Sequence, residues 1–142
     1  MAKNPVDFTD QKIKERLDIW TALSEIFVNV EQTQEEFDQH LDIIARNVAP
    51  MGYSLESLNN IIVNEIGPLF IKNFSILNPL PETDFWTREQ VETIMKQFRA
   101  QRNTLDGRAQ RLFMKDPLKN PTVSRRWKGL QERLTKLGVT QT

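Results

Sequence analysis

The chain has 142 residues, of which 39% are hydrophobic, and it carries 19 basic and 19 acidic side chains but no cysteine. This length is typical of one domain with a core of its own, and the absence of cysteine excludes disulfides and thiolate metal sites. No apolar run approaches the roughly 18 residues that a membrane span needs, and the N-terminus lacks the apolar region of a secretory signal, so we expect a cytoplasmic protein.

Apolar residues at helical spacing dominate the first half of the chain. One segment starts at Thr9 or Asp10, and a second begins at a capping box over residues 33–36. A third begins after Ser54 and meets Gly67-Pro68, where the missing N–H of proline predicts a kink or an interruption. The residues expected to share the core are Trp20, Leu23, Phe27, Phe37, Leu41, Ile44, Leu58, Ile62 and Phe70.

The second half of the chain predicts further helices. A capping box over residues 87–90 precedes an apolar stripe that ends at Phe98, and a last amphipathic helix is expected to end at Gly138. No segment has a convincing strand pattern. We therefore predict an all-α fold, a compact bundle of five or six helices that forms a single helical domain over residues 1–142, with a basic C-terminal helical extension over residues 99–142.

The two halves of the chain differ strongly in charge. Residues 1–95 carry 7 Lys/Arg and 16 Asp/Glu, a net charge of −9, whereas residues 96–142 carry 12 Lys/Arg and 3 Asp/Glu, a net charge of +9. Two explanations stay open: the halves attract each other within the fold, or each of them faces a partner of opposite charge.

Five carboxylates gather where the second predicted helix begins. They are Glu31, Glu35, Glu36, Asp38 and Asp42. Such a cluster is commonly a solvated helix face, but like charges one turn apart repel by a few tenths of a kcal/mol per pair. Because a fold has no evident need for this repulsion, we interpret the cluster as a surface for a basic protein partner.

A basic cluster near the C-terminus supports a different hypothesis. It consists of Arg125, Arg126, Trp127 and Lys128. Basic side chains beside an aromatic ring could neutralise phosphates and stack on a base, as in proteins that bind nucleic acids. However, Trp127 is in register with Leu130 and Leu134, which favours a core position for this ring.

The sequence contains no motif for catalysis or cofactor binding. His40 is the only histidine, which is too few for a metal site, and we expect it on the solvated surface. There is neither a G-x-S-x-G turn nor a glycine-rich phosphate loop. We therefore predict that the protein is not an enzyme and uses no cofactor or metal.

Three motifs together resemble a family of small helical bacterial domains of unknown function. They are W-x-A-L-S-x-x-F from Trp20 to Phe27, Y-S-x-x-x-L from Tyr53 to Leu58, and E-[VI]-x-P-x-x-x-x-N from Glu65 to Asn73. The resemblance covers about residues 13–100 and leaves the basic tail outside. It implies a bacterial, cytoplasmic, all-helical protein, but it supplies no activity and no catalytic residues. We expect structural roles for Tyr53, Glu65, Pro68 and Asn73.

These observations favour a non-catalytic protein-binding module. The function that we expect is that of an immunity or antitoxin-type inhibitor, which binds and neutralises a cognate toxin or effector. The alternative is a nucleic-acid-binding or regulatory protein that uses the basic C-terminal segment. The oligomeric state is left open.

Overall fold

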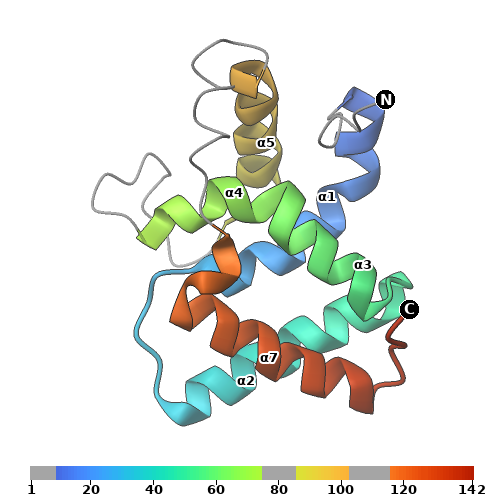
Figure 1. The fold of residues 1–142 in the computed structure, drawn as a ribbon, viewed down its shortest axis with the longest axis vertical. Helices are drawn as coiled ribbons and strands as arrows, with labels where there is room; N and C mark the ends of the chain where they lie inside the picture. Colours follow the sequence, from blue (N-terminus) through green and yellow to red (C-terminus); the bar gives the residue numbers. More distant parts are fainter. Residues whose placement is uncertain (1–8, 75–85, 103–115) are drawn as a thin grey trace.

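The computed structural model describes residues 9–74, 86–102 and 116–142, and every regular element among them is helical (Figure 1). The α-helices are α1 (Asp10–Ser24), α2 (Gln34–Val48), α3 (Leu55–Asn60), α4 (Gly67–Phe70), α5 (Arg88–Arg102) and α7 (Pro121–Lys136). A π-helix, Ile61–Ile66, joins α3 to α4, and short 3₁₀ turns cover Glu25–Phe27, Ala49–Met51, Ile71–Phe74 and Pro117–Lys119. The prediction of an all-α fold is confirmed. Part of the basic extension, residues 103–115, lies outside the described residues.

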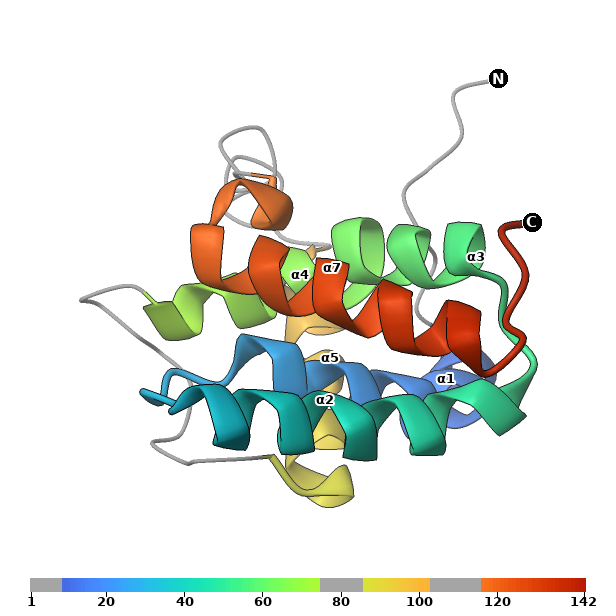
Figure 2. The ribbon, with the colours of Figure 1, turned by 90° about the horizontal axis from the view of Figure 1, so that it is seen from below.

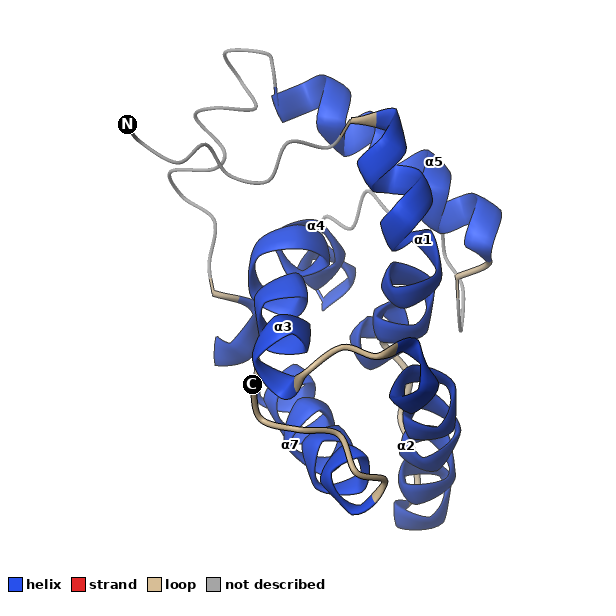
Figure 3. Cartoon of the chain, turned by 90° about the vertical axis from the view of Figure 1, so that its right-hand side faces the viewer, coloured by secondary structure: helices blue, strands red, loops and turns tan. Residues whose placement is uncertain are grey.

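The helices form two layers. In Figure 2, α1 and α2 make one layer, and α3, α4 and α7 make the other. Figure 3 shows the same two layers edge on. The last helix, α7, packs along α2, and α5 packs along α1. The basic C-terminal helix therefore lies directly against the helix that carries the acidic cluster.

The core lies between these layers and contains every residue that the sequence placed there. Trp20, Leu23, Phe27, Leu41, Leu58, Ile62 and Phe70 are fully buried, and Phe37 and Ile44 are nearly so. The Phe70 ring meets the edge of Trp86 at 4.8 Å between centroids and 87° between planes. Four polar residues are also buried among the described residues: Ser24, Glu65, Asn73 and Arg126.

The helix between Leu55 and Phe74 changes type without ending at Gly67-Pro68. The N–H of Gly67 donates to the carbonyl of Ile62, five residues earlier, which is the hydrogen bond of a π-helix. Pro68 then lies in the first turn of α4, a position at which proline is common. The irregularity predicted as a kink or an interruption is thus a change of helix type, from the π-helix to the short helix α4.

The C-terminus returns to the bundle after α7. Gly138 has a φ of +90°, and the N–H of Val139 donates to the carbonyl of Leu134, which confirms the predicted glycine stop. Beyond it, the carbonyls of Thr140 and Gln141 accept from the N–H groups of Leu55 and Glu56 at 2.9 and 3.0 Å. The tail therefore satisfies donors that the first turn of α3 would otherwise leave open. Within the described ranges, no helix has the length and apolar character needed to traverse a bilayer.

Candidate functional site

The acidic cluster begins at the capping box that starts α2. The Thr33 hydroxyl accepts from the N–H of Glu36, and the Glu36 carboxylate accepts from the N–H of Thr33, both at 3.1 Å. These bonds, the backbone one first, lower the pKa of Glu36. A lowered pKa means that the contribution of this carboxylate to stability is present at neutral pH and is lost as the pH falls through that pKa.

Two of the five carboxylates are paired with the C-terminal helix. Arg133 of α7 donates from Nη2 to Asp38 at 2.9 Å and from Nε to Asp42 at 2.8 Å. Its Nη1 atom donates to the backbone carbonyl of Gly129 at 3.0 Å. Asp38 and Asp42 therefore serve the contact between α2 and α7. For these two residues, the explanation that the halves of the chain attract each other accounts for the charge.

The other three carboxylates face solvent. Glu31, Glu35 and Glu36 are exposed, and in the described part of the chain none of them forms an ion pair. Ile43 is 56% exposed and lies seven residues beyond Glu36, two helical turns along the same face of α2. We call Glu35, Glu36 and Ile43, together with Glu31 in the connection just before the helix, the α2 face. It combines unneutralised negative charge with one large exposed apolar side chain.

We expect Arg133→Gln to lower the free energy of unfolding by about 1 kcal/mol, because it removes two partly exposed ion pairs. The loss should shrink at high salt, since screening weakens such pairs. Urea unfolding at low and high salt measures both effects. The exposed Lys136 of the same helix is the control, and Lys136→Gln should change stability little. Equal losses in the two variants would mean that the pairs to Asp38 and Asp42 contribute nothing.

The basic cluster is not the exposed group that the sequence indicated. Arg126 is only 3% exposed and donates to the backbone carbonyls of Ile26 at 3.1 Å, of Val28, and of Val30 at 3.2 Å. Burial, and then the charge of Arg125, lower the pKa of its guanidinium. The interpretation of Arg126 as a phosphate contact is therefore corrected. It fastens α7 to the connection between α1 and α2.

Trp127 is buried, as its register with Leu130 and Leu134 predicted, so it offers no ring for a base. Its indole N–H donates to the side-chain oxygen of Asn59 at 3.0 Å. Arg125 lies 4.2 Å over the ring of Phe37 and donates to Gln34 at 3.0 Å, both of them on α2. Of the four residues, Lys128 is exposed and Arg125 is exposed but occupied. The cluster mainly attaches α7 to the rest of the bundle.

The motif residues form contacts inside the bundle. The indole N–H of Trp20 donates to the buried carboxylate of Glu65 at 2.8 Å, and the Asn73 side chain donates to the carbonyl of Phe27 at 2.9 Å. These bonds link the helix from Leu55 to Phe74 with α1 and the turn that follows it. A structural role for Glu65 and Asn73 is the one that the sequence predicted.

His40 was predicted to lie on the solvated surface, but it is only partly exposed. Its side chain is 19% exposed and lies between Glu25 and Gln32, at 3.0 and 3.1 Å. It ties α2 to the end of α1. Over residues 9–74, 86–102 and 116–142, no group of His, Cys, Asp and Glu side chains is arranged to hold a metal ion.

Comparison with known proteins identifies a family but no activity. No curated protein and no solved structure matches the chain. One family model, described as a domain of unknown function (DUF7079), matches residues 14–133. The match runs well past residue 100, so most of the basic segment that we expected to lie outside the family is part of it. Because the model covers most of its length, the chain belongs to this family of domains of unknown function.

Proposed function

We propose that the chain is a non-catalytic protein-binding module of the immunity or antitoxin type, which binds and neutralises a basic toxin or effector in the bacterial cytoplasm. The observation that carries the proposal is the α2 face. Glu31, Glu35 and Glu36 have no neutralising partner among the described residues, whereas Asp38 and Asp42 share Arg133. The fold thus neutralises the two carboxylates that contact α7 and leaves the other three open.

The chemistry of the α2 face defines the kind of partner that fits it. Exposed carboxylates steer a positively charged protein and raise the rate of encounter at low salt. Ile43 supplies an apolar contact of the kind that anchors the centre of an interface. The partner that we infer presents lysine or arginine side chains around a small apolar hollow, as the basic active site of a nuclease-like toxin would.

The test is a charge reversal that spares the fold. Glu31→Lys combined with Glu35→Lys should slow association with the toxin-like product of a neighbouring gene by about tenfold at low salt. The effect should shrink as salt shortens the Debye length from about 10 Å at 0.1 M to about 3 Å at 1 M. Stopped-flow or surface-based kinetics measure it, and protection of cells that express the toxin should weaken in parallel.

Glu56→Lys combined with Glu89→Lys is the matched control. All four glutamates of the two doubles are exposed, so both doubles change the net charge equally. Glu35, Glu56 and Glu89 each lie in the first turn of a helix, so the control also includes the loss of an interaction with a helix terminus. The control should associate at the normal rate. Equal slowing in both doubles would reduce the effect to net charge, and unchanged kinetics in the first double would remove the α2 face as the binding surface.

A further inference from the structure

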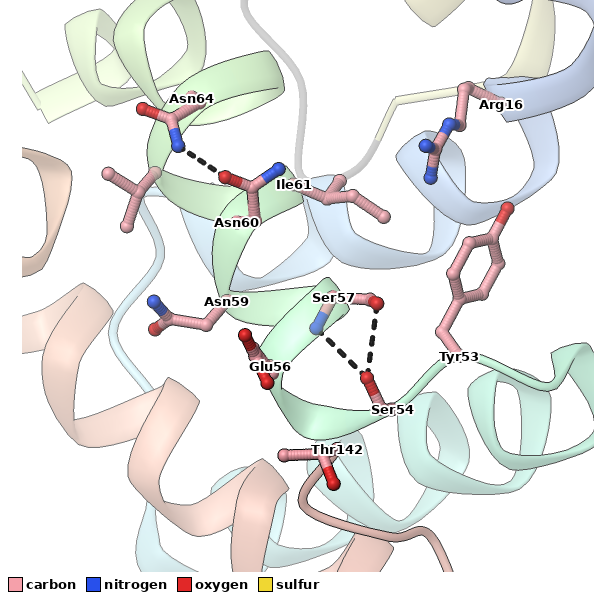
Figure 4. A pocket seen from close by; sticks show the side chains of 11 residues that line it. Arg16, Tyr53, Ser54, Glu56, Ser57, Asn59, Asn60, Ile61, Asn64 and Thr142 are labelled. Carbon is pink, nitrogen blue, oxygen red and sulfur yellow. Dashed lines mark hydrogen bonds between the residues drawn. The ribbon is translucent and has the colours of Figure 1, made fainter.

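A second polar surface lies beyond the C-terminal end of α2, away from Glu31 and Glu35. It is an open pocket of about 680 Å³ between α1 and the helix that begins at Leu55 (Figure 4). The residues that matter for its chemistry are Arg16, Tyr53, Ser54, Ser57, Asn60 and Asn64. None of them belongs to the α2 face or to the basic cluster.

Arg16 is held in this pocket without any hydrogen bond to the described part of the chain. Its side chain is 23% exposed, and its guanidinium lies 5.5 Å above the Tyr53 ring. Its Nε atom is 3.9 Å from Oε1 of Glu65, which is too long for a hydrogen bond. That oxygen already accepts from Trp20 at 2.8 Å. The guanidinium of this partly exposed side chain has unused N–H donors, which need water or a ligand as the acceptor.

The side chains beside Arg16 add further donors. Asn64 donates to the side-chain oxygen of Asn60 at 2.6 Å, which leaves the Asn60 amide nitrogen free. In Figure 4 this nitrogen points to the side of the helix where Arg16 and Tyr53 lie. The Ser57 hydroxyl accepts from Ser54 at 3.0 Å, so its own proton is available.

Glu56 also lines the pocket, and it lies four residues before Asn60, one helical turn along α3. Figure 4 shows Arg16 and Tyr53 on one side of the pocket and Glu56 with Asn59 on the other. The carboxylate of the buried Glu65 lies 3.9 Å from Arg16 and partly balances its positive charge. It is too far away to accept a hydrogen bond from Arg16. The Arg16 side of the pocket is thus a set of donors around one cation.

We propose that this side of the pocket binds an oxyanion, the phosphate or carboxylate group of a small molecule. The planar fork of arginine matches two oxygens of either group, and the Asn60 amide and Ser57 hydroxyl complete the set. Because Glu65 offsets part of the charge, the free ion alone should bind weakly, with a Kd in the millimolar range. The site is a further function of the chain and does not depend on the α2 face.

The experiment is an NMR titration of the full ¹⁵N-labelled chain at constant ionic strength. Inorganic phosphate is the first probe, citrate is the second, and chloride is the reference. The Arg16 Nε–H signal and the backbone amides of Ser57 and Asn60 should shift saturably with phosphate, with citrate, or with both. Saturation by phosphate alone assigns a phosphate-bearing ligand, and saturation by citrate alone assigns a carboxylate.

Asn60→Asp is the deciding variant, because Asn60 is exposed and the change places a negative charge beside the bound oxyanion. It should weaken binding at least tenfold. Asn47→Asp makes the same change at an exposed position of α2 and should leave binding unchanged. Arg16→Gln should abolish the saturable shift if it folds, and Asn60→Asp decides the matter if it does not. Shifts that stay linear, match those in chloride, or survive Asn60→Asp overturn the proposal.

Discussion

Arg126→Met is expected to lower the free energy of unfolding by about 3–5 kcal/mol. Methionine fills much of the volume of arginine but donates no hydrogen bond, so the carbonyls of Ile26, Val28 and Val30 lose their donor. A buried acceptor left without a partner costs roughly 1–3 kcal/mol. The loss should appear in urea unfolding as a lower midpoint with an unchanged slope, provided that unfolding remains two-state.

The neighbouring arginine supplies the control. Arg125 is exposed, and its contacts are the Phe37 ring and one hydrogen bond to Gln34. Arg125→Met should cost about 1 kcal/mol or less, because an exposed cation–π contact contributes about 0.5–1 kcal/mol. If the two variants were equally stable, the three carbonyls would find water when Arg126 is lost, and the anchoring role of this residue would have to be abandoned.

Gly67→Ala is expected to cost about 3 kcal/mol or more. A Cβ atom added at this position would lie 2.0 Å from the carbonyl oxygen of Ile62 and 2.5 Å from Cγ of Pro117. The first contact is with backbone and the second is with a ring, so neither can move aside without shifting a helix. Overpacking of a tight core contact costs typically 1–3 kcal/mol and more when the backbone must shift. Thermal or urea unfolding measures the loss.

Gly129 is the matched comparison within α7. A Cβ atom there would come within 2.6 Å of Cδ1 of Leu41, which is the far end of a flexible side chain. The higher helix propensity of alanine, worth about 1 kcal/mol, should offset much of that crowding. Gly129→Ala should therefore cost clearly less than Gly67→Ala. The reverse order would show that the wide turn before Gly67 adapts more readily than the contact between α2 and α7.

The positions of the buried residues along α7 place Arg126 on the buried face of this helix. Val123 and Trp127 are four residues apart on the buried face, and Arg126 lies three residues after Val123 and four before Leu130. Its charge led the sequence interpretation to place it outside that face. What the sequence lacks is the position of the three carbonyls that accept from it, because these belong to a connection about a hundred residues earlier.

Local signals were reliable wherever both partners are close in the chain. The capping box at Thr33 and Glu36, the glycine stop at Gly138 and the apolar stripe of α2 all follow from neighbours within one or two turns. The pairing of Arg133 with Asp38 and Asp42 spans more than ninety residues, so only the packing of α7 on α2 could reveal it.

Neither the π-helix nor the pocket beside it can be predicted from the pattern of apolar residues. An apolar spacing of three and four residues does not distinguish a wide turn from a normal one, and Gly67-Pro68 predicted a kink or an interruption without showing its form. The sequence does not distinguish Arg16 from other arginines, because a single arginine on a helix is common. Its importance comes from Tyr53 and Glu65, which reach it from a different part of the chain.

The dependence of the first helices on the last one has a consequence for synthesis of the protein. The carbonyl of Ile26 accepts a hydrogen bond from Arg126, which is synthesised 100 residues later. The backbone N–H groups of Leu55 and Glu56 likewise have their acceptors at Thr140 and Gln141. At about 5–20 residues per second, a ribosome needs several seconds to supply them. During that interval the nascent chain exposes the apolar stripe of α2. Folding of this domain should therefore be completed only after α7 and the residues that follow it have left the ribosome, and products truncated before α7 should be substrates for chaperones.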